Sequence, residues 1–332
     1  MQYRKFSDLG WNVSEIGIGC GAIGSEWGEV SEVDAREVLK TSLDKGVNFF
    51  DTADVYGDGR SEKFVGELIK STSEKIFVTT KSGRRLNPHN AEGYNLKNIE
   101  GFIDRSLINL GIDCIDLLQL HCPPSEICPK KETYEMMDEI VKKGKIANYG
   151  VSVEKVSEAM DAIKFPNVKS IQIIFNIFRQ KPAEIFFKEA AKKKIAIIAR
   201  VPLASGLLTG KMNQNSVFPE NDHRNYNING DAFDIGETFS GVNFNQGLKV
   251  VEILKDLLPN NFSLTNLALK WILMHEEVSV VIPGAKNSSQ VKTNVHASEL
   301  ENISSLMPKI NSIYDEFIKP SVQNRWLFNS AL

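Results

Sequence analysis

The sequence predicts an α/β fold, a (β/α)₈ barrel with an N-terminal β-hairpin plug and extra C-terminal helices, formed by residues 1–332 as a single domain. Eight short apolar runs each stop at a polar or glycine-containing loop, and most of the segments between them have helical spacing of apolar residues. Runs such as Ile195–Ala199 are apolar throughout, as strands buried on both faces are. Eight such units in series favour a parallel sheet closed into a barrel.

The elements follow from the N-terminus onward. Residues Gln2–Phe6 and Asn12–Ser14 flank a turn at Gly10 and predict the hairpin. The eight predicted barrel strands are Ser14–Cys20, Val47–Thr52, Lys75–Lys81, Cys114–His121, Ile146–Ser152, Ser170–Asn176, Ile195–Arg200 and Val278–Gly284. Segments Gln290–Ala297 and Glu301–Phe317 predict the extra helices, and Pro320 is expected to begin a tail. The irregular segment Ser205–Ser240 is long for a loop, which is typical of functional or mobile segments.

Composition narrows the functional classes. The chain has 332 residues, 42% of them hydrophobic, and a formal net charge of −3, which favours a soluble globular protein over a nucleic-acid-binding one. We find no apolar span of membrane length, so no membrane partner is expected. The four cysteines have no metal-ligand spacing, so we predict free thiols, a cytoplasmic location and no bound metal.

Two glycine motifs resemble nucleotide-binding loops without meeting their requirements. Gly19–Gly24 has the spacing GxGxxG, but a dinucleotide-binding fold needs a helix that opens within the glycines, and no helix is expected before Ser31. Gly206–Lys211 resembles a P-loop that is one residue short and is followed by Met212. Its backbone amides remain a candidate phosphate site.

The residues with the clearest chemical content are Asp51, Tyr56, Lys81 and His121. Each ends a predicted strand or closely follows one, and the carboxyl ends of barrel strands share one mouth. Hydride reduction of a carbonyl needs a proton donor at the oxygen. Tyr56 can serve if the ammonium of Lys81 lowers its pKa from about 10, and Asp51 would keep Lys81 charged. His121 can donate a hydrogen bond that orients the carbonyl.

Over nearly its whole length the chain resembles the aldo-keto reductase family. The motifs that carry the resemblance are GVNFFDTADVYG at residues 46–57, VTTK at 78–81, DLLQLH at 116–121, PL at 202–203 with GLLTGK at 206–211, and IPGAK at 282–286. The resemblance implies a barrel, a catalytic tetrad of Asp51, Tyr56, Lys81 and His121 with Tyr56 as general acid, the cofactor NADP(H), and a small carbonyl substrate.

The resemblance also implies a set of cofactor contacts. Ser152 and Gln172 would hold the nicotinamide carboxamide, Leu207, Gly210 and Lys211 the pyrophosphate, and Lys286 the 2′-phosphate. The complete expected set is Gly19, Ser152, Gln172, Arg200, Pro202, Leu203, Leu207, Gly210, Lys211, Gly284, Lys286, Gln290 and Asn294. The chain departs from the family pattern at Val153, where many members have Asn, and at Arg200, where an aromatic residue often stacks on the nicotinamide.

Two other functions compete with reduction. A lysine at the end of a barrel strand can form a Schiff base, so Lys81 is also a candidate aldolase nucleophile. A non-catalytic, nucleotide-sensing subunit is a further alternative on the same fold, as in the potassium-channel β-subunit branch of the family. For the substrate, aromatic residues at Trp27, Tyr94, Phe218 and Trp326 suggest an uncharged or aromatic carbonyl.

Overall fold

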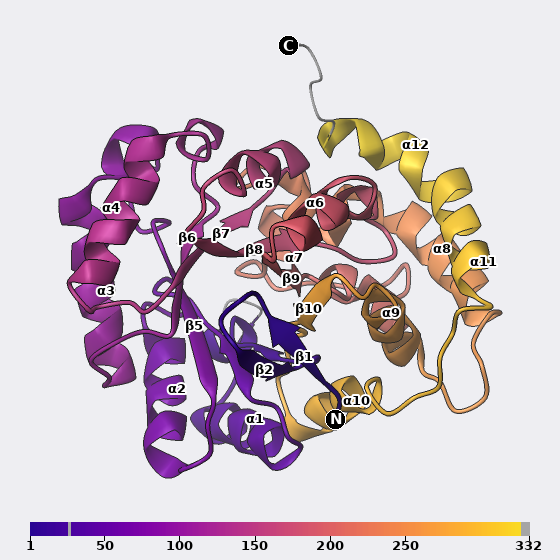
Figure 1. The fold of residues 1–332 in the computed structure, drawn as a ribbon. Helices are drawn as coiled ribbons and strands as arrows, with labels where there is room; N and C mark the ends of the chain where they lie inside the picture. Colours follow the sequence, from indigo (N-terminus) through magenta and orange to yellow (C-terminus); the bar gives the residue numbers. More distant parts are fainter. Residues whose placement is uncertain (26–27, 327–332) are drawn as a thin grey trace.

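The computed structural model describes residues 1–25 and 28–326 and has eight parallel strands in a nearly closed barrel with helices between them (Figure 1). The barrel strands are β3 (Ile18–Gly19), β4 (Phe49–Asp51), β5 (Phe77–Ser82), β6 (Leu117–His121), β7 (Tyr149–Val153), β8 (Val168–Ile174), β9 (Ala196–Arg200) and β10 (Val278–Val281). Each strand pairs with the next in chain order. Parallel bridges from Ile16 to Val281 and from Gly19 to Gly284 join the first strand to the last. The predicted barrel and its eight strands are confirmed.

The N-terminal hairpin closes one end of the barrel, as predicted. Strands β1 (Tyr3–Phe6) and β2 (Trp11–Ser14) pair antiparallel and lie across the barrel in Figure 1. The ring of Phe6 lies 5.4 Å from that of Phe49, and the ring of Trp11 lies 4.5 Å from that of Phe77. These rings belong to a separate apolar cluster with residues from β6, β9 and β10. The hairpin therefore completes the core inside the barrel and leaves the opposite mouth open.

Helices cover the outside of the barrel. They are α1 (Glu32–Asp44), α2 (Arg60–Ser71), α3 (Leu96–Leu110), α4 (Lys131–Lys142), α5 (Val156–Ala162), α6 (Phe186–Lys192), α7 (His223–Tyr226), α8 (Phe244–Lys255), α9 (Leu264–Leu273), α10 (Ser288–His296), α11 (Met307–Ile313) and α12 (Lys319–Val322). Helix α1 begins directly after Ser31, whose hydroxyl accepts a hydrogen bond from the amide of Asp34 at 3.1 Å. As predicted, no α-helix opens within the glycine motif, but a short 3₁₀ helix, η1 (Ala22–Gly24), lies there.

The C-terminal region corrects two sequence-based boundaries. The second extra helix begins at Met307 instead of Glu301, with Pro308 in its first turn. Pro320 was expected to begin a tail, but it lies in the first turn of α12, where a missing amide hydrogen costs nothing. Helical structure therefore continues past this proline.

The strand register explains why distant polar residues meet at one mouth. Asp51 pairs with Thr79, Lys81 with Gln119, and His121 with Ser152. Each of these side chains stands at or near the carboxyl end of a strand, so all of them face the same end of the barrel.

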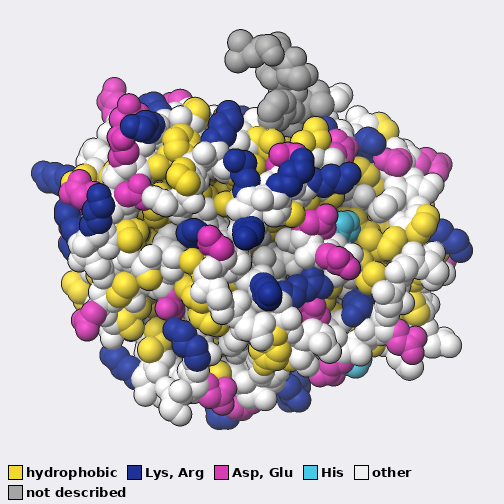
Figure 2. Space-filling view, viewed as in Figure 1, with side chains coloured by type: hydrophobic (Ala, Val, Ile, Leu, Met, Phe, Trp, Pro, Cys, Tyr) yellow, Lys and Arg dark blue, Asp and Glu magenta, His cyan; other side chains and the backbone are white. Residues whose placement is uncertain are grey.

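The state of the cysteines, the length of the helices and the distribution of surface charge relate to the predicted free thiols and to the expected partners. All four cysteines are free thiols, as predicted; Cys114 is exposed and the other three are buried. None of the helices in the described part of the chain combines the length and apolar character needed to cross a bilayer. On the face shown in Figure 2, basic and acidic side chains are interspersed.

Candidate active site

Lys81 links the members of the predicted tetrad. Its Nζ donates hydrogen bonds to the carboxylate of Asp51, to the carbonyl of Thr52 at 2.9 Å and to the hydroxyl of Tyr56 at 3.4 Å. The ring of His121 stands edge-on to that of Tyr56, with centroids 6.0 Å apart. Asp51, Lys81 and His121 are buried. The structure therefore brings the four predicted residues together.

Two glutamines complete the shell around Asp51. Its Oδ2 accepts hydrogen bonds from Gln172 at 2.8 Å and from Gln119 at 3.1 Å. Gln172 was expected to hold the nicotinamide carboxamide, but its amide nitrogen is directed to the carboxylate of Asp51. Gln119 lies in the DLLQLH motif and was not predicted as a site residue. The sequence did contain a signal for it. Residues two apart in a strand point to the same face, and Gln119 lies two residues before His121 in the same predicted strand.

The electrostatics of the Tyr56–Lys81 pair differ in part from the prediction. Burial opposes the charge on Lys81, but Asp51 and Tyr56 outweigh it and raise the pKa of the ammonium above its usual value. Burial raises the pKa of Tyr56, and Lys81 opposes that rise without cancelling it. The expected effect of Lys81 on the phenol is present, but the net shift is upward because desolvation is larger. Tyr56 is therefore protonated at neutral pH, as a proton donor must be.

His121 is held in its neutral form. Burial lowers the pKa of its imidazole well below the usual value, and the charges of Arg84 and Lys81 lower it further. A neutral imidazole has one N–H donor and one acceptor. The ring can therefore donate one hydrogen bond without adding a net charge beside the phenol.

The glycine pattern at residues 19–24 has a packing role in this structure. A Cβ on Gly24 would lie 2.8 Å from the backbone carbon of Tyr56, and a Cβ on Gly19 would lie 2.9 Å from the carbonyl of Ile282. Both positions exclude larger side chains because backbone stands in the way. These glycines allow the Tyr56 loop to approach closely and the barrel to close, so their spacing has a reason other than a dinucleotide-binding turn.

A cavity of about 430 Å³ opens at the same mouth. Asp51 and Tyr56 line it together with four cationic side chains, Arg200, Lys211, Arg224 and Lys286. Of the predicted cofactor residues, the cavity lining includes Gly19, Gln172, Arg200, Pro202, Leu203, Lys211, Gly284, Lys286, Gln290 and Asn294. The catalytic residues Asp51 and Tyr56 and the basic side chains thus line the same cavity.

Three predicted cofactor residues are not in the cavity wall. Ser152 is buried, and its hydroxyl lies 3.6 Å from the sulfur of Cys122. Leu207 is fully buried in the main core. Gly210 has a φ of +70° and ends the 3₁₀ turns η5 (Ala204–Thr209), a conformation that glycine adopts without strain. Leu207 and Gly210 therefore help to fix the conformation of the GLLTGK segment without lining the cavity.

The IPGAK segment follows β10 and was expected to contact the cofactor. Side chains of helix α10 hold its backbone in place. The backbone amide of Lys286 donates to the side-chain oxygen of Gln290 at 2.8 Å, and the amide of Asn294 donates to the carbonyl of Gly284 at 3.2 Å. Gln290 and Asn294 were both expected to contact the cofactor. In this structure their side chains fix the backbone that carries Lys286.

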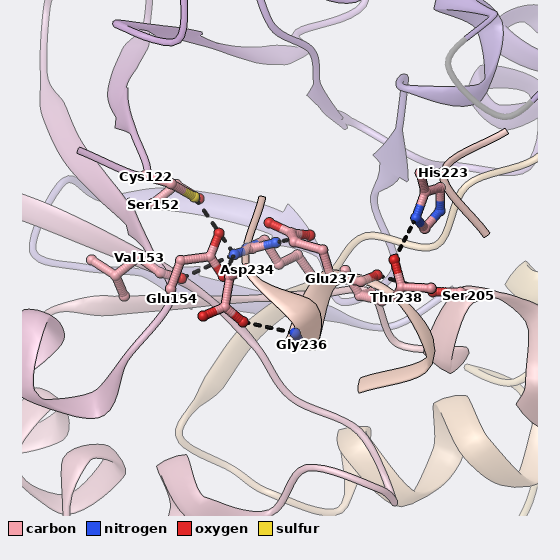
Figure 3. A network of polar contacts seen from close by, with 12 residues as sticks. Cys122, Ser152, Val153, Glu154, Ser205, His223, Asp234, Gly236, Glu237 and Thr238 are labelled. Carbon is pink, nitrogen blue, oxygen red and sulfur yellow. Dashed lines mark hydrogen bonds and ion pairs between the residues drawn. The ribbon is translucent and has the colours of Figure 1, made fainter. Parts of the chain in front are cut away.

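Arg200 does not stand free to stack on a ring. Its Nη1 donates to Glu237 at 2.6 Å, and its Nη2 donates to Glu154 at 3.1 Å and to the carbonyl of Val153 at 3.0 Å. Figure 3 shows the side chains of Cys122, Glu154 and Glu237 converging in this region. Sequence reasoning did not identify either glutamate, since their partner lies far away in the chain.

Arg224 is a further functional candidate that the sequence did not reveal. Its guanidinium is held by the carboxylate of Asp222 at 2.6 Å, and it lines the cavity. Burial and the charge of Arg224 lower the pKa of Lys286, so the two cations act on each other. Arg224 belongs to the irregular segment Ser205–Ser240. The length of this segment was the signal in the sequence that it has a function.

Comparisons with known proteins identify the family of the chain. A sequence model described as the Aldo/keto reductase family matches residues 15–315. The chain belongs to the aldo/keto reductase family. Aldo-keto reductase YhdN of Bacillus subtilis is 32% identical over 299 residues, which cover 88% of this chain and 87% of that protein. Aldo-keto reductase yakc [NADP(+)] of Schizosaccharomyces pombe is 30% identical, covering 91% of this chain and 89% of its own.

Other relatives extend this picture. A probable voltage-gated potassium channel subunit beta of Arabidopsis thaliana is 28% identical and covers 98% of each chain. The solved structure of aldo-keto reductase AKR11C1 from Bacillus halodurans, in its holo form, is 28% identical, with a TM-score of 0.74 over 94% of this chain and 96% of that one. The family, the barrel fold and the oxidoreductase class that the sequence predicted are confirmed.

Proposed function

We propose that this chain is an NADPH-dependent reductase that converts an aldehyde or ketone into an alcohol, with Tyr56 as the general acid. The observation that carries the proposal is the 3.4 Å contact between the ammonium of Lys81 and the hydroxyl of Tyr56, beside a cavity that is also lined by four basic side chains. A proton donor and a binding site for phosphates are the two parts that such a reaction needs.

Each residue of the tetrad has a separate role in the proposed reduction. When bound, the reduced nicotinamide supplies a hydride to the carbonyl carbon. The carbonyl oxygen takes the proton of Tyr56, and the product is an alcohol. Lys81 then lies beside the phenolate and stabilises it, while Asp51 keeps Lys81 charged. The neutral ring of His121 positions the carbonyl oxygen by a hydrogen bond.

The chain fits a dinucleotide that carries a 2′-phosphate. Lys286 and Arg224 line one cavity and each is a cation, so a dianionic phosphate would relieve their mutual repulsion. Lys211 ends the GLLTGK segment, lines the same cavity and suits the pyrophosphate. The name of the Schizosaccharomyces pombe relative, which includes NADP(+), supports the same cofactor.

The two alternatives account for the site less well. A Schiff-base lysine needs a lowered pKa and access to substrate. Lys81 instead has a raised pKa and is 1% exposed. For a non-catalytic, nucleotide-sensing subunit, the assembled tetrad would have no use, although a potassium-channel subunit is among the relatives.

The experiment that tests the proposed function is NADPH oxidation with a panel of aldehydes, ketones and sugars, followed at the absorbance of the reduced nicotinamide. We expect turnover with at least one class of carbonyl, and the matching alcohol as product. Tight NADPH binding without turnover of any carbonyl would favour the nucleotide-sensing subunit. Trapping of Lys81 by borohydride with a carbonyl substrate would favour the aldolase.

Cofactor preference gives a separate prediction. Lys286→Ala should weaken NADPH binding by about 10- to 100-fold, because a charge-assisted contact to a phosphate contributes about 1.5 to 3 kcal/mol. NADH lacks the 2′-phosphate, so its affinity should hardly change, and the loss for NADPH should shrink as salt rises. Titration of both nucleotides by fluorescence quenching measures this.

The matched control is Lys292→Ala, which removes an exposed lysine from α10, the helix that follows Lys286, without touching the cavity. It should leave both affinities unchanged. Equal losses for NADPH and NADH in the Lys286 variant would show that this lysine does not read the 2′-phosphate.

A further inference from the structure

Four charged side chains form a second polar cluster at the mouth of the barrel, beside the tetrad. This four-charge cluster consists of Arg84, Glu154, Arg200 and Glu237. They follow or end strands β5, β7 and β9, except Glu237, which ends the 3₁₀ turn η6 (Ile235–Glu237). Arg84 Nη2 lies 3.1 Å from Glu154 and 3.2 Å from Glu237, and Arg200 contacts the same two carboxyl groups at 3.1 and 2.6 Å. Figure 3 shows Glu154 and Glu237 directed toward each other.

Burial shifts the cluster toward an excess of positive charge. A carboxylate oxygen of Glu154 and one of Glu237 lie within 4.8 Å of each other, and both side chains are buried or nearly so. Burial and the charge of Glu237 raise the pKa of Glu154, while Arg200 and Arg84 keep the pKa of Glu237 low. Glu154 is therefore driven toward its neutral form, beside two guanidinium groups and the carboxylate of Glu237.

Neighbouring charges do not remove this excess. Arg179 donates to the backbone carbonyl of Glu154 and adds a positive charge, and Asp234 adds a negative one nearby. Cys122 also faces the cluster, 3.6 Å from Arg200, but burial raises the pKa of its thiol to about 12 and leaves it neutral. Cys122, Glu154 and Glu237 have the donor atoms of a metal site. The two arginines already occupy the carboxylates, which favours an anion over a cation here.

The positive charge of the cluster acts on Tyr56 and His121. Arg200 and Glu237 line the same cavity as Tyr56. The charges of Arg84 and Arg200 both lower the pKa of His121, and that of Arg84 also acts on Tyr56. An anionic group on a substrate whose carbonyl lies between Tyr56 and His121 would meet this field in a site where water screens it poorly.

Arg84 is the more exposed arginine of the cluster, although it is not part of the lining of the cavity. Its side chain is 26% exposed, against 9% for that of Arg200. Both of its ion pairs use Nη2, and its Nε and Nη1 make no hydrogen bond to another described residue. The carbon of its guanidinium lies 5.8 Å from the centre of the Phe233 ring. It follows Lys81 by three residues on the loop after β5, so it lies close to the tetrad along the chain. The planar fork of arginine suits a carboxylate or a phosphate.

We propose that the preferred substrates are small carbonyl compounds with an anionic group, carboxylate or phosphate, and that Arg84 binds this group while Tyr56 and His121 hold the carbonyl. This inference rests on the proposed reductase function and makes Arg84 a specificity-determining residue. It departs from the uncharged or aromatic substrate that the sequence suggested. Tyr94 is buried and hydrogen-bonded to His89, and Phe218 packs on Phe239. Trp27 and the side chain of Trp326 lie outside the described residues.

The test compares matched substrates with NADPH as cofactor. We would measure kcat/KM for 4-carboxybenzaldehyde against its methyl ester, and for glyceraldehyde 3-phosphate against glyceraldehyde. We expect the wild type to favour at least one anionic member by about 10- to 100-fold, as a charge-assisted contact gives. The pair with the larger ratio identifies carboxylate or phosphate as the group that is read.

Variants then assign the preference to Arg84. Arg84→Gln should lower kcat/KM for the anionic member by about tenfold or more, mainly through KM, and should lower it for the neutral member by a much smaller factor. Arg84→Lys, which keeps the charge, should retain part of the preference. Arg85→Gln is the matched control, because Arg85 is equally exposed but pairs with Asp58 outside the cluster. Thermal unfolding and NADPH affinity of each variant show whether the fold and cofactor site are intact.

The outcomes separate this inference from the proposed function. If the wild type turns over neutral and anionic members equally, or if Arg84→Gln and Arg84→Lys lower both equally while NADPH binding is unchanged, Arg84 does not read an anion. Reduction of carbonyls is then still established. If no carbonyl is reduced at all, the proposed function fails, and this inference fails with it.

Discussion

Tyr56→Phe should lower kcat for carbonyl reduction by about 10²- to 10⁴-fold, the usual contribution of a general acid. The substitution removes the hydroxyl that lies 3.4 Å from Lys81 and leaves the ring in place. Lys81 keeps its bonds to Asp51 and to the carbonyl of Thr52, so the fold and the affinity for NADPH should hardly change. Steady-state kinetics with the best carbonyl substrate, together with fluorescence titration of NADPH, measure the two effects separately.

A matched control makes the same chemical change elsewhere. Tyr3→Phe removes a hydroxyl that donates to the carbonyl of Gly46, in the hairpin away from the catalytic mouth. Its kcat should equal that of the wild type. Turnover by the Tyr56 variant at a rate close to that of the wild type would show that another group supplies the proton.

Lys81→Met should abolish measurable reduction and also destabilise the protein. The variant loses the ammonium beside Tyr56, and it leaves the carboxylate of Asp51, which is 3% exposed, without its ionic partner. Breaking a buried ion pair by removing one partner costs about 3 to 5 kcal/mol. We expect the lower end of this range, because Gln119 and Gln172 still donate to the carboxylate. Denaturant unfolding followed by circular dichroism measures the free energy.

Two further variants separate the ion pair from a general effect of losing a lysine. Asp51→Asn combined with Lys81→Met removes both charges, so it should recover much of the stability without restoring activity. Lys40→Met removes a lysine that is 73% exposed and pairs with Asp44 on the surface, and it should change stability by less than about 0.5 kcal/mol. A Lys81→Met variant that is as stable and active as the wild type would refute the role of this lysine.

The barrel itself was accessible from the sequence because its signal is local. Strands buried on both faces leave continuous apolar runs, and each run stops where the chain enters a loop. All eight predicted strands are present, with ends that differ by a few residues. The tetrad could also be predicted, because Asp51, Lys81 and His121 end strands and a closed parallel barrel brings strand ends to one mouth.

Residue boundaries controlled by proline were harder to predict. Pro320 removes an amide donor and usually ends a helix, yet at a first-turn position that donor is not needed. Which of the two cases applies depends on where the preceding helix stops. Spacing alone does not show this.

The side-chain partners within the site were decided by the tertiary structure. Gln172 turns to Asp51, 121 residues earlier, and Arg200 pairs with Glu237, 37 residues later on an irregular segment. Sequence periodicity reports which face of a strand a residue occupies, whereas a hydrogen bond depends on how two distant segments are placed to within a fraction of an ångström. The sequence by itself therefore determined the barrel and the four residues at its mouth. The closed fold alone decided how their neighbours are charged, since only folding brings Arg84, Glu154, Arg200 and Glu237 within reach of one another.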